Sequence, residues 1–424
     1  MMRTGPSRQP RIQQERNIVA GLDIGTSKIA LVIGEVDHDG NLSVLGVGTS
    51  PSIGLRQGVV INLDQTVQSV GRAVQEAQLT AGFEVREVLV GISGDHIQGI
   101  NSRGVVAVSG PDREIGQNDV DRVIEAATAF NLPKDRQVIH VLQQEFIVDS
   151  QSGIKNPIGI SGVRLEAEVH IITGSSTISD NIIKAVQKAG LEVSKLALEP
   201  LASSYAVLDQ NEKDLGVVLL DIGGGTTDIV LFFDGAIRHT AVIPLGGQAV
   251  TNDIALGLKT PLDQAEEIKK RHGWAIWSGE SKGELFLVPG IGGRNAREAS
   301  SDILTSIIQP RMEEIFMLAM KEIKRSEFAG RLAAGVVLTG GGSLVRGAAD
   351  LAEQTFGMQV SLGVPKGFSG LVESAASPIY STGVGLLLWG AHDSGKTLRT
   401  SRRRRKDWFG EAGQSFRRFL KDYF

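Results

Sequence analysis

Residues 221–230 read DIGGGTTDIV, and this stretch decides the fold. The apolar run VVLL precedes it at 217–220 and IVLFF closes it at 229–233, which predicts two buried strands joined by a turn of Gly and Thr. Such a turn presents backbone N–H groups and hydroxyls without bulky side chains, an arrangement that binds phosphate oxygens. A single glycine turn is more often only a tight hairpin, so further turns of this kind are needed.

A second stretch repeats the pattern. Residues 21–33 read GLDIGTSKIALVI and residues 220–231 read LDIGGGTTDIVL. Two hairpins with the same Asp-Ile-Gly start predict a duplicated domain with a cleft between its halves. Asp23 and Asp221, at the strand ends, would approach a Mg²⁺ ion through its waters, because Mg²⁺ keeps most of its hydration shell. Lys28 would neutralise phosphate charge.

A third glycine turn, TGGGS at 339–343, follows a predicted strand and precedes a predicted helix. It is expected to border the base and ribose of a nucleotide. The three turns match neither the Rossmann fingerprint nor the P-loop. Taken in this order, they favour a site that holds a polyphosphate from two sides.

Composition sets the class of protein. A chain of 424 residues suggests two or more domains. It contains no Cys, which excludes disulfides, thiolate metal sites and a cysteine nucleophile. The first twenty residues show no apolar core of a signal peptide, and no run of eighteen apolar residues occurs, so a cytoplasmic protein is expected.

Charge is distributed unevenly along the chain. Residues 399–424 carry nine basic and three acidic side chains, a net +6, so the remaining residues carry −10 of the total −4. A basic tail on an acidic body predicts an anionic partner at the tail. Nucleic acid is not expected, because no basic patch elsewhere supports the run SRRRRK at 401–406.

The last eighteen residues predict an amphipathic helix. At about 100° per residue, the apolar side chains fall on one arc and the charged ones on the other. The apolar arc includes Trp408, Phe409, Phe416, Phe419, Leu420, Tyr423 and Phe424. Because aromatics dominate and basic residues precede it, this pattern favours a helix that lies on anionic membrane lipids. The alternative is a terminal helix packed onto the body of the protein.

With these residues in view, the chain resembles the actin, Hsp70 and sugar-kinase superfamily. LDIGTSKIA (22–30) is similar to its first phosphate motif, LLDIGGGTTDIV (219–230) to the second and VVLTGGGSLV (336–345) to the adenosine motif. LALEPLASSYAVL (196–208) and PIYSTGVGLLLWG (378–390) resemble its connecting helices. Within the superfamily, GIKNPIGISGVRLEAEVHIIT (153–173), IRHTAVIPLGGQAVTNDIA (237–255) and AEEIKKRHG (265–273) resemble the FtsA family of bacterial cell division.

The resemblance implies an α/β fold in which two actin-like, ribonuclease H-like halves enclose a nucleotide cleft, with a small inserted α/β subdomain and a C-terminal amphipathic helix. The expected parts follow the chain. They are a disordered arm (1–16), a first half (17–84 and 167–210), the insert (85–166), a second half (211–245 and 334–390), its outer subdomain (246–333), a flexible linker (391–406) and a membrane-targeting helix (407–424).

The resemblance also assigns roles to residues. ATP and Mg²⁺ are the implied cofactors. The implied contacts are Asp23, Gly25, Thr26, Ser27 and Lys28 on the first turn, Asp221, Gly223, Gly224, Gly225 and Thr226 on the second, Gly341, Gly342 and Ser343 at the adenosine, and Glu266 and Lys269 at the ribose and base. A solvated ion pair is the alternative for Glu266 and Lys269. Glu199 stands where a residue orients the attacking water, or is a structural carboxylate.

The implied function is that of a nucleotide-binding adaptor, with slow ATP hydrolysis left open. A member of the family would anchor the FtsZ ring to the cytoplasmic face of the cell inner membrane at the division site, self-associate into actin-like polymers and help recruit other division proteins. Arg311 is the candidate contact for the FtsZ C-terminal peptide, or pairs only with Glu314. A pilus-assembly scaffold and a small-molecule kinase of the same superfamily are the alternatives.

Overall fold

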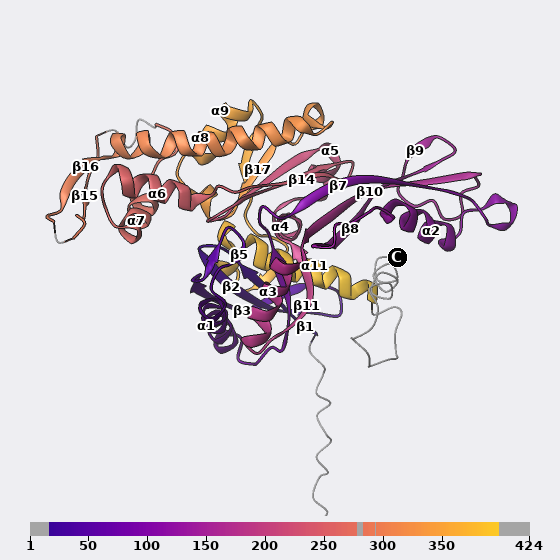
Figure 1. Cartoon of the computed structure of the whole chain (residues 1–424), viewed down its shortest axis with the longest axis horizontal. Coiled ribbons are helices and arrows are strands. Elements are labelled where there is room, and N and C mark those ends of the chain that lie inside the picture. The colour runs from indigo at the N-terminus through magenta and orange to yellow at the C-terminus, as the bar shows by residue number, and fades with distance from the viewer. Residues whose placement is uncertain (1–16, 278–282, 293, 398–424) are drawn as a thin grey trace, which may run out of the picture.

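Two central β-sheets of the same topology organise the molecule (Figure 1). The structure is a computed structural model that describes residues 17–277, 283–292 and 294–397. The first sheet has the order β19-β3-β2-β1-β6-β11, and without its edge strand β19 it matches the second, β14-β13-β12-β17-β18. In the first sheet, β1 pairs antiparallel with β2 and parallel with β6. In the second, β12 pairs antiparallel with β13 and parallel with β17, so β1 and β12 occupy equivalent positions. The predicted duplication is confirmed.

The strands of both sheets begin and end as follows. In the first sheet they are β1 (Asn17–Ile24), β2 (Lys28–Val36), β3 (Leu42–Pro51), β6 (Glu87–Ile92) and β11 (Glu192–Leu198); in the second, β12 (Val217–Ile222), β13 (Thr227–Phe233), β14 (Ala236–Ile243), β17 (Val336–Thr339) and β18 (Val360–Leu362). All six residues of β12 are buried. Strands buried on both faces read as continuous apolar runs, which explains the sequence pattern around the glycine turns.

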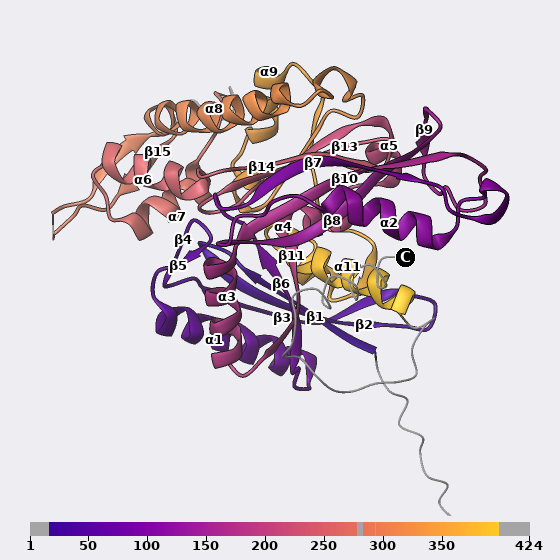
Figure 2. The ribbon, with the colours of Figure 1, turned by 45° about the vertical axis from the view of Figure 1, so that its right-hand side comes forward.

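Helices cover both faces of the first sheet. α1 (Leu63–Ala81) packs on β2 and β3, and α3 (Ser176–Lys188) packs beside α1. α4 (Glu199–Val207) and α11 (Ser381–Thr397) lie against each other, and α11 packs on β1 (Figure 2). Glycines permit these close approaches, because a Cβ on Gly48 would lie 2.2 Å from the Ala73 carbonyl oxygen of α1.

The inserted subdomain has its own sheet, of order β7-β10-β8-β9, with α2 packed on β7 and β10. Its elements are β7 (Gln98–Ala107), α2 (Gln117–Thr128), β8 (Arg136–Val148), β9 (Gln151–Ile154) and β10 (Arg164–Ser175). The predicted bounds 85–166 need correction at both ends. β6 belongs to the first sheet, and β10 stays in the inserted sheet as far as Ser175 because it pairs with β7 and β8 along its length.

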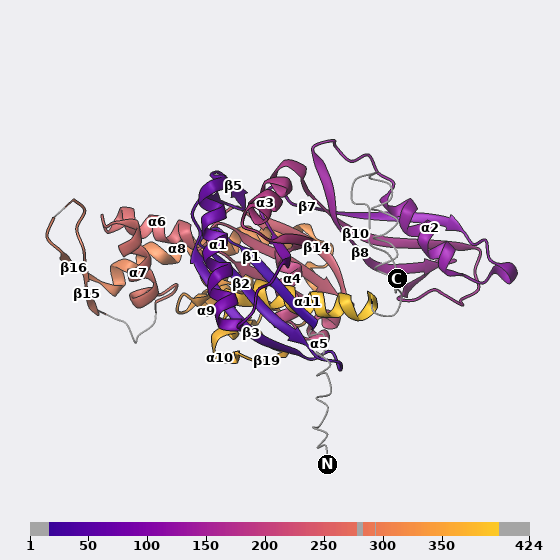
Figure 3. The ribbon, with the colours of Figure 1, turned by 90° about the horizontal axis from the view of Figure 1, so that it is seen from below.

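The outer subdomain of the second half lies on the side of the molecule opposite to the insert (Figures 1 and 3). It consists of α6 (Gly247–Gly257), α7 (Leu262–His272), the hairpin β15 (Leu285–Val288) and β16 (Arg297–Ser300), and the long α8 (Ser301–Arg325). Helix α9 (Ala348–Phe356) packs on α8. The predicted range of this subdomain was 246–333.

The end of the described chain returns to the first half, which corrects the prediction that 334–390 all belong to the second. β19 (Phe368–Gly370) pairs parallel with β3, and α10 (Val372–Ala375) follows it. α11 then covers β1 and continues to Thr397, so the predicted linker is wrong for residues 391–397, which are helical. Residues 1–16, the rest of that linker and the predicted membrane helix lie outside the described residues.

Short elements complete the described chain. These are the small hairpin of β4 (Leu55–Arg56) and β5 (Val59–Val60), and helix α5 (Gln210–Leu215) before β12. Within residues 17–277, 283–292 and 294–397, every helix is too short or too polar to cross a bilayer.

Candidate functional site

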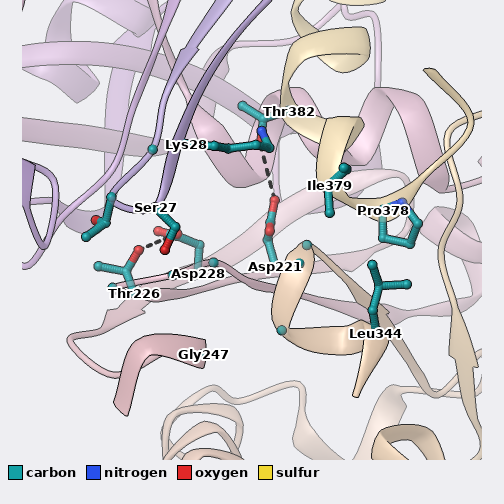
Figure 4. Close-up of a pocket in the computed structure, with 18 of the residues that line it drawn as sticks. Ser27, Lys28, Asp221, Thr226, Asp228, Gly247, Leu344, Pro378, Ile379 and Thr382 are labelled. Atoms are coloured by element: carbon teal, nitrogen blue, oxygen red, sulfur yellow. Dashed lines mark hydrogen bonds between the residues drawn. The ribbon is translucent and has the colours of Figure 1, made fainter. Parts of the chain in front are cut away.

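A cleft of ≈ 580 Å³ lies between the two halves, and both glycine hairpins line it (Figure 4). This volume falls in the range of small-molecule sites, about 300–1,000 Å³. Of the predicted site residues, those that line the cleft are Asp23, Gly25, Thr26, Ser27, Lys28, Glu199, Asp221, Gly223, Gly224, Gly225, Thr226, Glu266, Lys269, Gly341 and Gly342. The sequence motifs therefore converge on one place.

The first turn joins β1 to β2 and carries an ion pair. Lys28 Nζ lies 2.9 Å from Asp23 Oδ2, and the Lys28 ammonium also stands 5.4 Å from the centroid of the Tyr380 ring. Asp23 is buried, whereas Lys28 is partly exposed to the cleft. The lysine can thus reach an anionic ligand while it stays near its acidic partner.

The second turn, between β12 and β13, touches the first. A Cβ on Gly224 would stand 2.0 Å from Ser27 Oγ, and one on Gly225 would stand 2.7 Å from Thr26 Oγ1. Ser27 and Thr226 lie on facing turns in Figure 4. A side chain at either position would force Ser27 or Thr26 of the first turn to shift.

The N-terminus of α6 is held against the same second turn. The N–H groups of Gly247 and Gln248 donate to the carbonyl oxygens of Gly223 (2.9 Å) and Gly224 (2.8 Å). These bonds turn the carbonyl groups of the turn toward α6. The outer subdomain is therefore hydrogen-bonded directly to the glycine turn that lines the cleft.

Asp221 is the last residue but one of β12, just before the turn. Its Oδ2 accepts hydrogen bonds from Ser203 Oγ (2.6 Å) and Thr382 Oγ1 (3.4 Å), two hydroxyls on α4 and α11. Burial raises the pKa of Asp221 to about 6, and the hydroxyls oppose this shift. Sequence reasoning missed Ser203 and Thr382, because only the tertiary fold brings their helices to the carboxylate.

Asp228 was also missed, although it lies in the opening stretch DIGGGTTDIV. It is opposite Asp221 in the β12–β13 ladder and buried, with its carboxylate accepting from Ser93 Oγ and from Thr226 Oγ1 (3.3 Å). Burial raises its pKa to about 7. An acid at the start of an apolar strand, directly after the glycine turn, was the available signal.

Glu199 is the first residue of α4 and faces the cleft. A Cβ on Gly91 of β6 would lie 3.0 Å from its Cγ, so the glycine leaves room for the carboxyl group. Burial raises the pKa of Glu199 well above its usual value. Neighbouring carboxylates add to the shift, namely Asp23, Asp228 and Asp221.

The third glycine turn follows β17. Gly340 has φ +78°, which favours glycine, and a Cβ there would stand 2.3 Å from Asp221 Oδ1. Ser343 departs from the prediction, because it is absent from the cleft lining among the described residues. Its buried hydroxyl donates to the Gly340 carbonyl oxygen (2.7 Å) and closes the turn.

Glu266 and Lys269 of α7 form the predicted ion pair, Nζ to Oε2 at 2.7 Å, but not on a solvated face. The buried Lys269 ammonium also donates to the Gly247 carbonyl oxygen (2.9 Å) and to Thr251 Oγ1 (2.8 Å). The pair therefore holds α7 to the start of α6. The ion pair therefore has a structural role within the outer subdomain. A ligand in the cleft would contact it through Glu266, which faces the cleft.

Four carboxyl groups line the cleft together with the two glycine turns: Asp23, Asp221, Asp228 and Glu199. Among the described residues, no cluster of three or more His, Asp or Glu is arranged to bind a metal directly. This arrangement fits a cation held through its waters better than one held by side chains alone. The donor set and the glycine cradle fit a polyphosphate with a hydrated Mg²⁺ ion.

Arg311 lies on α8, away from the cleft. Its guanidinium donates to both carboxylate oxygens of Asp253 on α6 (2.6 and 3.2 Å) and to Glu314. The pairing with Glu314 named as the alternative is therefore present. A partner that binds Arg311 has to compete with Asp253 and Glu314 for its guanidinium group.

Comparison with known proteins defines the class. Two family models match: "Cell division protein FtsA" at residues 218–385 and "SHS2 domain inserted in FTSA" at 94–173. Among solved structures, the PilM–PilN type IV pilus biogenesis complex has a TM-score of 0.63 at 20% identity, covering 90% of this chain and 99% of the other. MreB5 of Spiroplasma citri bound to ADP has 0.56 at 13%, covering 91% and 99%. The protein is thus an actin-like protein with an inserted SHS2 domain.

Curated relatives narrow the class to one family. The chain is 50% identical to cell division protein FtsA of Pseudomonas aeruginosa over 89% of this chain and 90% of the relative. It is 43% identical to FtsA of Escherichia coli K12 over 89% and 91%, and 40% to that of Bacillus subtilis over 87% and 82%. The chain belongs to the FtsA family of cell division proteins. The family named from the motifs is confirmed.

Proposed function

We propose that this division protein binds ATP with Mg²⁺ in the cleft and tethers the FtsZ ring to the cytoplasmic face of the cell inner membrane. The observation that carries nucleotide binding is the contact between Gly224 and Ser27, where two glycine-bearing turns from separate halves meet. Turns of this kind offer N–H groups to phosphate oxygens from both sides. The MreB5 structures with ADP and AMPPNP share this fold and support the same ligand class.

Each end of the cleft has its own part in binding. The turns at 25–27 and 223–226 bind the phosphates, and Lys28 supplies a positive charge beside them. Asp23 and Asp221 orient the waters of a bound Mg²⁺, which neutralises phosphate and carboxylate charge together. At the other end, Gly341, Gly342 and Glu266 border the adenosine.

Slow hydrolysis of ATP is a further part of the proposal. Glu199 faces the same cleft as both phosphate turns, where its carboxyl group can orient a water molecule. Its raised pKa follows from burial among other acids, and a cation beside them would lower that pKa again. The adaptor role needs binding only, so hydrolysis is separable from it.

The remaining partners are assigned to other surfaces. Residues 407–424, outside the described range, would lie on anionic lipids, with basic residues of 401–406 at headgroup level. The outer subdomain 246–333 would receive the FtsZ C-terminal peptide near Arg311. Self-association into actin-like polymers and recruitment of other division proteins complete the proposed role.

Flotation with liposomes tests the tether. The full chain and a chain ending at Lys406 are each mixed with anionic liposomes, ATP, Mg²⁺ and FtsZ, and the floating fraction is analysed. We expect the full chain to rise and to carry FtsZ with it, whereas the shortened chain leaves both below. Equal behaviour of the two chains would contradict the tether.

The two alternative functions predict different outcomes. A small-molecule kinase would release a phosphorylated product, detectable when ATP is supplied with candidate alcohols. A pilus scaffold has support from the PilM–PilN likeness, but at 20% identity that likeness shows the fold alone. The relatives that are 40–50% identical are cell division proteins.

A further inference from the structure

Residues 93–97 join β6 of the first half to β7 of the inserted subdomain, and they pass the phosphate end of the cleft. Ser93 lines that cleft. The buried Ser93 Oγ donates to Asp228 Oδ1 on β13, which belongs to the second half. The other oxygen of this carboxylate accepts from Thr226 on the phosphate turn. One carboxylate therefore links the second phosphate turn to the base of the insert.

The same segment is bound to two strands of the inserted sheet. The His96 carbonyl oxygen accepts from Arg136 Nη2 at the start of β8 (2.9 Å), and His96 Nδ1 accepts from the Ser175 N–H at the end of β10 (3.2 Å). A shift of residues 93–97 would thus move the ends of both strands. Segment and sheet behave as one body.

A second hydrogen bond joins the two halves, in addition to that between Ser93 and Asp228. Gln57, at the tip of the β4–β5 hairpin, donates from Nε2 to the Pro244 carbonyl oxygen just after β14 (2.8 Å). Its neighbour Gly58 has φ +79°, and a Cβ there would stand 2.2 Å from the Ser93 carbonyl oxygen. The hairpin tip is therefore wedged between Ser93 and the second half.

The insert also rests on the second half through β14 (Figure 2). Gln144 Nε2 donates to the Ile237 carbonyl oxygen (2.7 Å), His170 Nε2 lies 2.9 Å from Thr240 Oγ1, and Arg238 pairs with Glu145 (3.1 Å). Gln144, His170 and Arg238 are buried, so undocking of the insert has to give each of them a water partner in place of the lost hydrogen bond. The insert is joined covalently to one half and by such polar contacts to the other.

We propose that the Ser93–Asp228 hydrogen bond couples the nucleotide state of the cleft to the docking of the inserted subdomain on β14. The coupling rests on the proposed binding of ATP with Mg²⁺. Ser93 has a single hydroxyl proton, and Asp228 faces the place where phosphate and hydrated cation would enter. A ligand that draws Asp228 toward itself changes the position of Ser93, and through His96 the position of β8 and β10. By linkage, the docked state of the insert alters nucleotide affinity to the same degree.

Hydrogen exchange of the full chain, with and without ATP and Mg²⁺, tests the coupling. Peptides that cover 98–107 and 236–243 report the docking of the insert on β14. In the wild type we expect nucleotide to change their exchange, and we expect Ser93→Ala to lose this response. Ser93→Thr keeps the hydroxyl and should restore it. Ser109→Ala is the matched control, because it removes a hydroxyl–carboxylate bond to Asp119 inside the insert but far from the cleft.

The outcomes separate the coupling from nucleotide binding itself. Calorimetry measures ATP binding on the same samples. A wild type that binds no ATP overturns the proposed nucleotide function and the coupling with it. ATP binding together with an unchanged response in Ser93→Ala overturns the coupling alone. Should Ser93→Ala fail to fold, Gln57→Asn serves instead, because its shorter side chain removes the second hydrogen bond, and it should reduce the response.

Discussion

Gly224 and Ser27 belong to opposite halves of the molecule, yet a Cβ on Gly224 would stand 2.0 Å from Ser27 Oγ. The two halves can approach this closely because Gly224 has no side chain. Because the phosphates are proposed to lie against both turns at once, their binding requires this separation to be kept.

Gly224→Ala is therefore expected to weaken ATP binding. The added methyl group overpacks the junction of the turns, which typically costs about 1–3 kcal/mol, equivalent to about a five- to 150-fold loss of affinity. Calorimetry with ATP and Mg²⁺ measures the change. Gly71→Ala is the control, since a Cβ at Gly71 on α1 meets nothing within 4 Å. Equal affinity in both variants would show that the turns do not hold the nucleotide together.

Ser203→Ala is expected to destabilise the folded protein. It removes the 2.6 Å hydrogen bond to the buried Asp221 carboxylate and leaves this oxygen with only the longer 3.4 Å bond from Thr382, a loss that costs about 1–3 kcal/mol at a buried acceptor. Urea unfolding at pH 7.5 gives the difference. The loss should shrink at pH 5, where Asp221, with a pKa of about 6, is largely protonated in the folded protein. A loss that is independent of pH would contradict this origin.

Two buried histidines predict a loss of stability in acid. Burial lowers the pKa of His140 and of His170 to about 4, below the usual 6.5. A lowered pKa means that the unfolded chain binds the proton first, so this stability is complete above pH 6.5 and disappears as the pH falls toward 4. Between pH 7.5 and 5 each histidine should remove about 2 kcal/mol.

The raised pKa values of Asp221 and Asp228 act in the opposite direction, because they favour the folded state at low pH. The test is thus the slope of unfolding free energy against pH in His170→Gln relative to wild type. The variant should show a shallower loss between pH 6.5 and 5, whatever its stability at pH 7.5. Parallel slopes would reject the assignment.

Arg311→Ala and Asp253→Asn separate the two roles of Arg311. Each variant breaks the Arg311–Asp253 pair between α8 and α6, but only the first removes the guanidinium. If Arg311 contacts the FtsZ C-terminal peptide, Arg311→Ala weakens peptide binding by about 1.5–3 kcal/mol, the worth of a charged hydrogen bond, or about ten- to 150-fold, and Asp253→Asn does not. Fluorescence anisotropy of a labelled peptide measures both. Equal losses would assign Arg311 to the framework of the subdomain.

Local patterns predicted the parts of the fold that local chemistry determines. The repeated Asp-Ile-Gly turns and the apolar runs beside them identified both sheets, because strands buried on two faces need such runs. The hydroxyls of Ser203 and Thr382 were not identifiable, since nothing near them in the sequence indicates a carboxylate partner. Asp228 was recognisable as an acid beside an apolar run, but although the second phosphate motif covers it, no role had been assigned to it.

The predicted end of the insert, residue 166, falls within β10, which belongs to the inserted sheet along its whole length. β10 is one continuous strand from Arg164 to Ser175, so the composition does not change at the edge of the insert. The polar residues after Gly390 were interpreted as linker because they lack apolar periodicity, yet α11 continues through 397. The sheet that α11 covers is determined by tertiary packing and cannot be deduced from the sequence of the helix. It packs on the first half, where Trp389 is buried beside Leu89 and Ala197.

The packing of α11 on the first half determines which part of a membrane-tethered molecule would move. The predicted membrane segment follows α11, so a bilayer would hold the first half through it. Opening or closing of the cleft would then leave the first half fixed and swing the second half, with α8 and Arg311, through space above the membrane. The nucleotide cleft would then act as a hinge between a first half held at the membrane and a second half that contacts the FtsZ ring.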